Sequence, residues 1–350
     1  MTSTRPDRVI VIGCGLIGTS VALALTRAGV RVALDDVDTA ALDEACRMGA
    51  GTALTEDTPV ADLVVIATPP SAVVDTLYRA QARGLGRAYT DVASTKEHIW
   101  AEAALRGSDL LGYVPGHPMA GRELSGPGAA VPDLFAGRPW ILCPYPTVDP
   151  EALAAVDALV RLCGGVRRDL TPAAHDRAAA ALSHVPQVVS SALAGQLAGL
   201  GPDILALAGA GVTDTTRTAG SDPALWADIL GQNASVVAEA VERLAGELGS
   251  LARELRAGGS GPSDGVRELL DRGNAGRAAL LAAAGTTAAN TAAAGPAAGP
   301  AAPAPARTRA AAAGTRTGPP YLPPHRPYRS PLLRPGRPAG PVPRIRRFAR

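Results

Sequence analysis

The sequence predicts an α/β domain, then an all-α domain, then a disordered C-terminal tail. Apolar strand patterns alternate with helical patterns up to about residue 170, which is typical of βαβ units and a parallel sheet. From Pro172 onward the periodicity is helical only, and beyond about Thr286 the chain is low-complexity sequence of Ala, Pro, Gly and Arg. We therefore expect domains at 1–170 and 171–277, and a tail at 278–350.

Composition limits the class of protein. A chain of 350 residues can bury two hydrophobic cores. Hydrophobic content is 47% with 3% aromatic, no apolar run approaches the roughly 18 residues of a membrane-spanning helix, and the N-terminus lacks a signal-peptide layout. The widely spaced cysteines form no metal or redox pattern; they are Cys14, Cys46, Cys143 and Cys163. These features predict a soluble cytoplasmic protein with reduced thiols, no bound metal and no membrane contact.

The net charge of +2 conceals two oppositely charged parts. Residues 286–350 contain eleven arginines and no acid, whereas the first 285 residues carry 23 basic and 32 acidic side chains, a net charge of −9. An acidic folded part argues against a nucleic-acid partner. The low-complexity tail cannot bury enough apolar surface to fold. Binding of acidic partners by this tail is one reading, but we favour a solvated tail without that role.

The first elements form a dinucleotide-binding motif. Arg8–Gly13 predicts a buried strand, a helix follows to about Ala28, and Val30–Leu34 predicts a second strand. Between the first strand and the helix lies Gly13-Cys14-Gly15-Leu16-Ile17-Gly18. Its glycines permit a tight turn, close approach of a pyrophosphate and helix–strand packing, while the helix N-terminus binds the anion. This context predicts a Rossmann domain in which residues 13–18 bind the cofactor.

The expected cofactor is NAD. Asp36, or its neighbour Asp35, ends the second strand about 20 residues after the glycines, where a carboxylate accepts hydrogen bonds from ribose hydroxyls. The same carboxylate would repel the 2′-phosphate of NADP, and no arginine follows it immediately. The sequence therefore favours NAD over NADP.

Later strands are expected to end at the same crevice. Further elements are predicted at 40–48 (helix), 62–67 (strand), 88–91 (strand) and from residue 97 (helix). Thr68 and Pro69 follow one of these strands, and Ser94 and Lys96 follow another, which places all four beside the cofactor. Ser94 and Thr95 also fit helix N-caps, and Lys96, the only lysine of the chain, also fits a solvated surface charge.

The segment GHPMAG at 116–121 presents a histidine in an unusual setting. His117 lies between a glycine and a proline, so its backbone is extended or turned, and we expect it on a loop. A lone histidine more often packs or caps a turn than takes part in catalysis. The dinucleotide motif before it, and a histidine and an arginine motif after it, favour the catalytic role. Strands at 139–143 and 166–169 and a helix at 151–163 complete the first domain.

The second domain is predicted as a set of Ala-rich helices. His175-Asp176 begins a long apolar segment that passes through Ser183–Gln187 to about Ala198. A second segment at 209–222, helices at 226–244 and 247–256, a linker at 258–263 and an amphipathic stretch at 265–277 follow. Apolar helical faces of this kind pack against another helix, in the same chain or in a second subunit. We therefore expect a homodimer.

Together the motifs resemble the prephenate/arogenate dehydrogenases of tyrosine biosynthesis, from about residue 8 to residue 277. Five segments carry the resemblance: GCGLIG (13–18), DVASTK (91–96), GHPMAGRE (116–123), SHVPQ (183–187) and DTTRTAGSDPALW (214–226). Singly only GHPMAG is distinctive, but five in this order are specific. The resemblance implies a Rossmann domain followed by a helical dimerisation domain. It also implies oxidative decarboxylation of a cyclohexadienyl substrate with NAD(P), which yields an aromatic ring.

The resemblance further implies roles for individual residues. His117 matches the catalytic histidine that accepts a hydrogen bond from the ring C4 hydroxyl. Ser94 matches the serine that orients this histidine near the nicotinamide. His184 matches a residue that contacts the substrate side chain, and Arg217 matches one that binds a substrate carboxylate. Three further substrate-site positions are the ionic-gate acids Glu123 and Asp214 and the aromatic Trp226. Lys96 falls in the serine–lysine motif of the cofactor site.

Two departures from the family pattern leave alternatives open. Gln187 stands where many relatives have a second histidine, so the choice between prephenate and arogenate stays open. The low-complexity tail stands where some relatives carry an ACT-type regulatory domain. One hypothesis is that a frame shift in GC-rich DNA replaced such a domain with the tail.

We predict conversion of prephenate to 4-hydroxyphenylpyruvate with NAD. Arogenate and 4-amino-4-deoxyprephenate are alternative substrates. A β-hydroxyacid-type dehydrogenase is disfavoured, because such enzymes use a lysine in the helical domain and Lys96 lies in the first domain. From a different class, the chain could be a non-catalytic NAD-binding sensor whose tail recruits partners.

Overall fold

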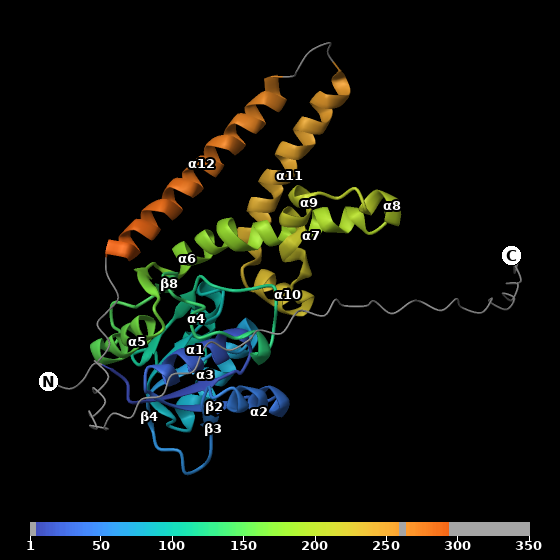
Figure 1. Cartoon of the computed structure of the whole chain (residues 1–350). Coiled ribbons are helices and arrows are strands. Elements are labelled where there is room, and N and C mark those ends of the chain that lie inside the picture. The colour runs from blue at the N-terminus through green and yellow to red at the C-terminus, as the bar shows by residue number, and fades with distance from the viewer. Residues whose placement is uncertain (1–4, 259–263, 294–350) are drawn as a thin grey trace, which may run out of the picture. The chain divides into compact units, whose positions relative to one another are not determined.

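The computed structural model describes residues 5–258 and 264–293 of the chain (Figure 1). Within them, six strands form one parallel sheet in the order β3-β2-β1-β4-β5-β6. The strands are β1 (Arg8–Ile12), β2 (Arg31–Asp35), β3 (Thr52–Ala53), β4 (Ala61–Ile66), β5 (Gly86–Asp91) and β6 (Tyr113–Val114). This is the Rossmann strand order, with its reversal point between β1 and β4. The predicted fold class is confirmed, although the two-residue strands β3 and β6 were too short to be predicted.

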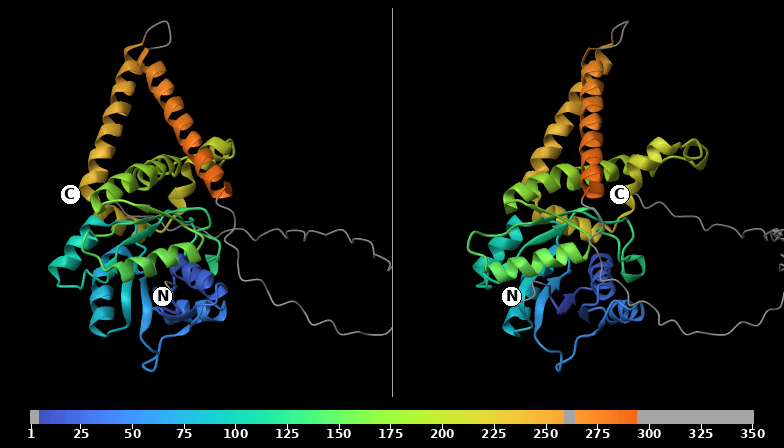
Figure 2. Two further views of the ribbon diagram at one scale, coloured as in Figure 1. Left: turned by 90° about the vertical axis from the view of Figure 1, so that its left-hand side faces the viewer. Right: turned by 60° about the vertical axis from the view of Figure 1, so that its left-hand side comes forward.

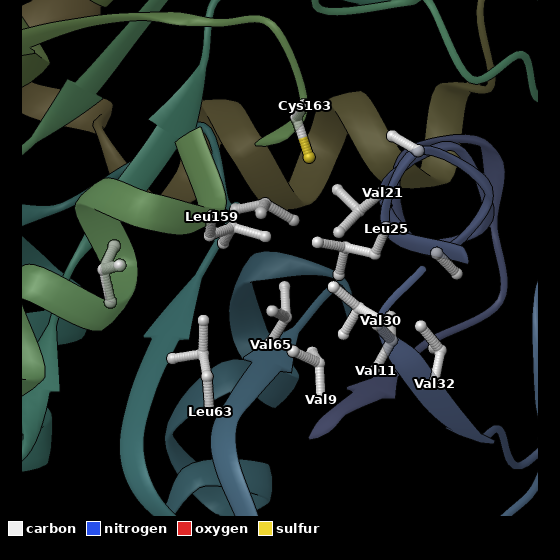
Figure 3. Close-up of a cluster of buried hydrophobic side chains, with 14 of the residues drawn as sticks. Val9, Val11, Val21, Leu25, Val30, Val32, Leu63, Val65, Leu159 and Cys163 are labelled. Atoms are coloured by element: carbon white, nitrogen blue, oxygen red, sulfur yellow. The ribbon is translucent and has the colours of Figure 1, made fainter. Parts of the chain in front are cut away.

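Helices cover both faces of this sheet because its side chains alternate between the faces. Val9, Val11, Leu63 and Val65 point to one face, where Figure 3 shows them packed with α1 and α5 residues. The intervening residues of β1 and β4 belong to a second cluster, with α3 and α4. The helices are α1 (Leu16–Arg27), α2 (Thr39–Arg47), η1 (Pro70–Ala72), α3 (Val73–Ala82), α4 (Glu97–Leu105) and α5 (Pro150–Leu162). Burial on both faces explains why residues 9–12 of β1 and 63–66 of β4 are continuously apolar.

A second, smaller sheet carries the GHPMAG histidine. It has the order β7-β8-β9, with β7 (Gly116–Pro118) antiparallel to β8 (Pro139–Leu142) and β8 parallel to β9 (Val166–Asp169). Residues 116–118 are therefore a strand, and the predicted loop at His117 is wrong. The extended backbone expected from the following proline is present, and pairing of His117 with Ile141 makes that backbone part of a ladder. A short 3₁₀ turn, η2 (Pro127–Ala129), lies between β7 and β8.

The second part of the chain is helical, as predicted. Its elements are α6 (Pro172–Ala179), the π-helical turn η3 (Ala180–His184), α7 (Val185–Leu197), α8 (Pro202–Leu205), α9 (Ala210–Thr216), the 3₁₀ turn η4 (Arg217–Gly220), α10 (Pro223–Gln232), α11 (Ala234–Ala257) and α12 (Asp264–Ala293). The predicted break between residues 244 and 247 is wrong, because α11 continues through it. A single glycine at 246 costs a helix only about 1 kcal/mol. The break lies instead at Asn233, where the backbone leaves helical geometry.

The C-terminal helix is longer than the amphipathic stretch predicted at 265–277. Helix α12 continues to Ala293, past the predicted start of the tail. Figure 2 shows α11 and α12 meeting at their linked ends, where the Gly265 N–H donates to Glu254 and Arg272 pairs with Glu247. The predictions for the remaining tail fall on residues 294–350, which lie outside the described residues. In the described part of the chain, no helix is both long enough and apolar enough to span a membrane.

Candidate active site

The glycine motif forms a backbone turn that fits an anion. Gly13 has φ +107°, and a Cβ on it would lie 2.4 Å from the Ala67 carbonyl oxygen. A Cβ on Gly18 would lie 1.9 Å from the Gly13 carbonyl oxygen, whereas a Cβ on Gly15 would meet nothing within 4 Å. Helix α1 begins after Gly15 with no side-chain cap, so its first N–H groups remain available to a ligand. The predicted roles of the three glycines agree with this geometry.

Two polar groups complete the cradle expected for a dinucleotide. Asp36, directly after β2, accepts the N–H of Cys14 on one carboxylate oxygen and the N–H of Asp38 on the other. Each oxygen keeps a lone pair for a ribose hydroxyl. At the end of β4, the buried Thr68 hydroxyl has no hydrogen-bond partner among the described residues, while Pro69 is exposed. An unpaired buried hydroxyl at this edge fits a bound ligand that supplies the missing partner.

Lys96 has an environment that the sequence analysis did not predict. Its side chain is fully buried, and its ammonium is paired with the buried Asp91, which ends β5. The other oxygen of Asp91 accepts a hydrogen bond from the Tyr113 hydroxyl at 2.6 Å. The alternative of a solvated surface charge is wrong, because the side chain is fully buried; the predicted place of Lys96 in the cofactor site stays a prediction. Burying an ammonium requires a paired carboxylate, and Asp91 provides it.

His117 is the end of a hydrogen-bonded row of three side chains. Its Nδ1 lies 2.7 Å from Nε2 of His175, and Nδ1 of His175 lies 2.7 Å from a carboxylate oxygen of Asp176. His175 and Asp176 are 0% and 1% exposed, and His117 is 8% exposed. Strand β7 presents His117, and helix α6, capped by Thr171, presents the other two. The second ring nitrogen of His117 has no hydrogen-bond partner among the described residues.

Ser94 and Thr95 do not have the contacts predicted for them. The His117 ring is held by His175, and Ser94 makes no side-chain hydrogen bond to any described residue. Neither hydroxyl caps helix α4, since its first N–H groups donate to Asp176 from Lys96 at 2.8 Å and from Glu97 at 2.9 Å. A carboxylate from a distant helix thus replaces the local cap, because an ionised acceptor makes the stronger bond at a helix N-terminus.

His184 lies beside this row in the π-helical turn. Pro186, two residues later, has no N–H to donate, and a π turn at this point accommodates the interruption. Nδ1 of His184 lies 3.2 Å from the Asn233 amide nitrogen, which also donates to the Asp176 carbonyl oxygen at 2.9 Å. Nδ1 therefore accepts, and the proton is on Nε2, which is buried without a partner among the described residues. The Trp226 ring stands edge-on to His184, with the centroids 6.2 Å apart.

The three buried histidines are neutral near pH 7. Burial, followed by the neighbouring His175 and Lys96, holds the pKa of His117 well below its ordinary value of 6.5. Burial also lowers the pKa of His175, against the hydrogen bond to Asp176. Burial lowers the pKa of His184 to about 4. Neutral imidazoles can accept or donate protons, so the cluster is suited to general base chemistry.

The remaining predicted substrate residues lie on and around η4. Arg217 pairs with Glu123 at 3.1 Å, which brings the arginine predicted to bind a substrate carboxylate together with one of the two acids expected at an ionic gate. Asp214 is exposed on α9 and makes no ion pair within the part of the chain that the structure describes. The buried Gln187 amide donates to the Thr218 carbonyl oxygen at 3.0 Å, next to Arg217. Gln187 therefore supports the turn that carries the arginine.

Sequence reasoning missed His175, Asp176, Asp91 and Asn233 as members of the site. The adjacent His and Asp at the start of an Ala-rich apolar helix were the available signal, because buried polar residues require partners. Their partners lie far away in sequence; His117 and His175, for example, are 58 residues apart. Spacing along the chain could not reveal this pairing.

Comparison with known proteins supports the family resemblance. Residues 21–168 match the family described as prephenate dehydrogenase, nucleotide-binding domain, and residues 171–271 match prephenate dehydrogenase, dimerization domain. The chain is 40% identical over 272 residues to a Streptomyces niveus protein named "Probable prephenate dehydrogenase NovF", covering 75% of each chain.

Solved structures of the same kind share the fold over most of the described residues. A prephenate dehydrogenase from A. aeolicus, in complex with hydroxyphenyl propionate and NAD+, is 26% identical, with a TM-score of 0.68 over 78% of this chain and 98% of that one. An arogenate dehydrogenase from Synechocystis is 28% identical, with a TM-score of 0.62 over 78% of this chain and 99% of that one. Both domains and their order match, and the chain belongs to the prephenate dehydrogenase family.

Proposed function

We propose that this chain catalyses the NAD-dependent oxidative decarboxylation of prephenate to 4-hydroxyphenylpyruvate. The observation that carries the proposal is the state of His117. It is a neutral imidazole with one nitrogen held by His175 and the other without a hydrogen-bond partner among the described residues. It lies on β7, directly after β6 of the parallel sheet whose strand β1 leads into the glycine turn. This is the arrangement that a base acting beside a bound nicotinamide requires.

NAD is the cofactor that the residues of this site fit. The glycine turn and the first turn of α1 would hold its pyrophosphate, and Asp36 would hold its adenosine ribose. When bound, NAD supplies the acceptor for the hydride that leaves ring carbon C4. The charge of Asp36 disfavours a 2′-phosphate, so we expect a clear preference for NAD over NADP.

The protein itself accepts and returns a proton, and it holds the charged substrate in position for the reaction. As hydride leaves C4, the C4 hydroxyl becomes a carbonyl and its proton passes to Nε2 of His117. Loss of CO₂ then aromatises the ring, and the proton returns to the phenolate oxygen. Base catalysis of this kind contributes about 10²- to 10⁴-fold to the rate.

Substrate recognition is assigned to the residues around His184 and η4. The Arg217 guanidinium suits a carboxylate in two-point contact, which a lysine does not provide. The Nε2–H of His184, buried without a described partner, is a donor that a polar substrate group would satisfy. Glu123 pairs with Arg217 in the structure, so substrate binding requires that the arginine exchange this partner or share it.

The test is the near-ultraviolet absorbance of reduced cofactor formed by purified protein and NAD. Prephenate, arogenate and 4-amino-4-deoxyprephenate are added in separate reactions, and each is repeated with NADP. We expect the highest kcat/KM with prephenate and NAD. His117→Asn should lose at least about 10²-fold in kcat while it still binds NAD.

The other outcomes decide among the alternatives. Turnover of arogenate or of the amino analogue alone would keep the reaction class and replace the substrate. An absence of turnover with all three substrates, with NAD binding intact, would favour a non-catalytic NAD-binding protein.

We also propose a homodimeric state and a cytoplasmic setting. The second domain matches a dimerization domain, and its helices α11 and α12 expose leucines along their length. All four cysteines are free thiols, which suits a reducing compartment.

A further inference from the structure

In the row formed by Asp176, His175 and His117, only one placement of the protons satisfies the hydrogen bonds while both imidazole rings are neutral. The hydrogen bonds from His175 and from the N–H groups of Glu97 and Lys96 lower the pKa of Asp176, although burial opposes ionisation. An ionised carboxylate only accepts, so Nδ1 of His175 carries a proton and Nε2 of that ring is a lone pair. Nδ1 of His117 must then donate to it. The lone pair of His117 is consequently on Nε2, the nitrogen without a hydrogen-bond partner in the part of the chain that the structure describes.

We propose that His175 and Asp176 are positioning residues that set the tautomer of His117 and take up part of the proton that it receives. The proposal rests on the proposed function, in which Nε2 of His117 accepts the substrate hydroxyl proton. When the Nε2–H bond forms, the Nδ1–H bond of His117 lengthens toward, or breaks to, Nε2 of His175. The positive charge then lies next to the Asp176 carboxylate. Return of the proton to the phenolate oxygen reverses each step, so no other proton source or acceptor is required.

The charges around the row favour this direction of transfer. Lys96 disfavours positive charge on both rings, but its own charge is compensated by Asp91. His184, the other titratable group facing His117, is neutral and adds only a weak effect. Asp176 is the carboxylate of the row and contacts the His175 ring directly. A proton held on His117 alone would lack that contact.

A purely structural role is the competing explanation. Asp176 caps α4 and is thereby needed for folding, so a change at Asp176 would not separate the two roles. His175 makes no bond to α4 and is the better position to change. Its glutamine variant distinguishes the roles, because an amide can donate to Asp176 and accept from His117 but cannot take up a proton.

The experiment compares His175→Gln, His175→Leu and the control His98→Gln, which changes an exposed histidine on α4. We expect both His175 variants to lose roughly 10²-fold in kcat with the NAD affinity near that of the parent. His175→Gln, which can keep both hydrogen bonds, should also keep the thermal midpoint, whereas His175→Leu should lower it because Asp176 loses its side-chain donor. The pH profile of kcat/KM should shift in both variants and stay in place in the control. Full recovery of kcat and of the pH profile in His175→Gln would overturn proton uptake by His175.

A second measurement does not depend on turnover. Nitrogen-15 spectra of histidine-labelled protein at pH 7.5 report which ring nitrogen carries the proton. We expect the Nδ1–H tautomer at both His117 and His175, and a mixture of tautomers at His117 in His175→Leu. The Nε2–H tautomer at His117 in the parent protein would overturn the proposal even if prephenate turnover is observed. The expected spectra in a protein without turnover would contradict the proposed function and leave the tautomer assignment standing.

Discussion

At the scale of the residue, one buried part of the first domain holds charged side chains that pair with each other. A fully buried polar group consists of Asp91, Lys96 and Tyr113, in which the Asp91 carboxylate bonds the other two side chains. The group is connected to Asp176, which accepts the backbone N–H of Lys96. The single lysine of the chain is therefore a structural cation, and its charge also opposes protonation of His117. Breaking such a pair leaves a buried charge without compensation, which costs more than the pair itself contributes.

Replacement of Lys96 should reveal this cost. Lys96→Met leaves the Asp91 carboxylate buried with Tyr113 as its remaining side-chain partner, and we expect the free energy of unfolding to fall by about 3–5 kcal/mol in urea titrations. Arg106→Met is the matched control, since its pair with Asp75 is half-exposed and should contribute under about 1 kcal/mol. Equal effects of the two substitutions would contradict the assigned role of the buried pair.

At the scale of the element, two glycines of the sequence motif meet different requirements, one for the packing of helix α1 and one for the approach of a ligand. Gly18 is needed so that α1 can pack on the sheet, because any Cβ there meets backbone atoms. Gly15 is not needed for packing, since its Cβ would point into open space and its φ of −74° suits any residue. The open space beside Gly15 is where a pyrophosphate is expected to approach.

Alanine substitutions test this separation. Gly18→Ala should lower the thermal midpoint strongly or prevent folding, because a 1.9 Å contact with the Gly13 carbonyl oxygen cannot be relieved by rotation of a side chain. Gly15→Ala should keep the midpoint of the parent and weaken NAD binding, measured by titration, about tenfold or more. Undiminished NAD affinity in Gly15→Ala would show that the cofactor does not approach this glycine.

Helix ends also position the second half of the site. The π turn places His184 toward Asn233, and Asn233 ends α10 with a side chain that bonds both His184 and α6. The break between α10 and α11 thus arises from a tertiary hydrogen-bonding requirement. Local propensity gave no comparable signal at this position.

At the scale of the whole molecule, three neutral buried histidines link stability to pH. In the unfolded chain each histidine takes up a proton near pH 6.5, whereas the pKa values of His117, His175 and His184 are lower in the folded chain. As pH falls below 6.5, the unfolded state binds protons that the folded state does not, so the free energy of unfolding falls. Above pH 6.5 this contribution is constant.

We expect urea midpoints to be level from pH 8 to pH 7 and to decrease from pH 6.5 toward pH 4. His184 alone, with a folded pKa of about 4, accounts for a loss of up to roughly 3 kcal/mol at pH 4. His184→Gln should reduce the slope. A stability that is independent of pH over this range would contradict the neutral cluster.

The exposed apolar face of α11 predicts the assembly state. Leu248 and Leu255, seven residues apart on one side of the helix, are 52% and 62% exposed. We expect the protein to have twice the mass of one chain in sedimentation measurements, and the Leu248→Glu, Leu255→Glu double variant to be a monomer. Leu105→Glu is the control, because this leucine is 88% exposed on α4 of the first domain. A monomeric parent protein would remove the basis for this prediction.

The sequence by itself determined the fold class and much of the site. Short apolar runs, the glycine motif and Asp36 are local signals, since each depends on residues close together in the chain. They were sufficient to predict the Rossmann sheet, the helical domain and the candidate roles of the glycines. The resemblance added His117, His184 and Arg217, and the structure brings His117 and His184 into one buried cluster.

Only the tertiary structure decided which side chains act together. His175 pairs with His117 across 58 residues, Asp176 caps a helix 79 residues before it, and Lys96 is paired with the buried carboxylate of Asp91. Buried polar groups must find partners wherever the fold brings them, and sequence spacing does not constrain such distant contacts. The proposed tautomer of His117 follows from that packing, which is why the motif alone could suggest a base but not the nitrogen that would accept the proton.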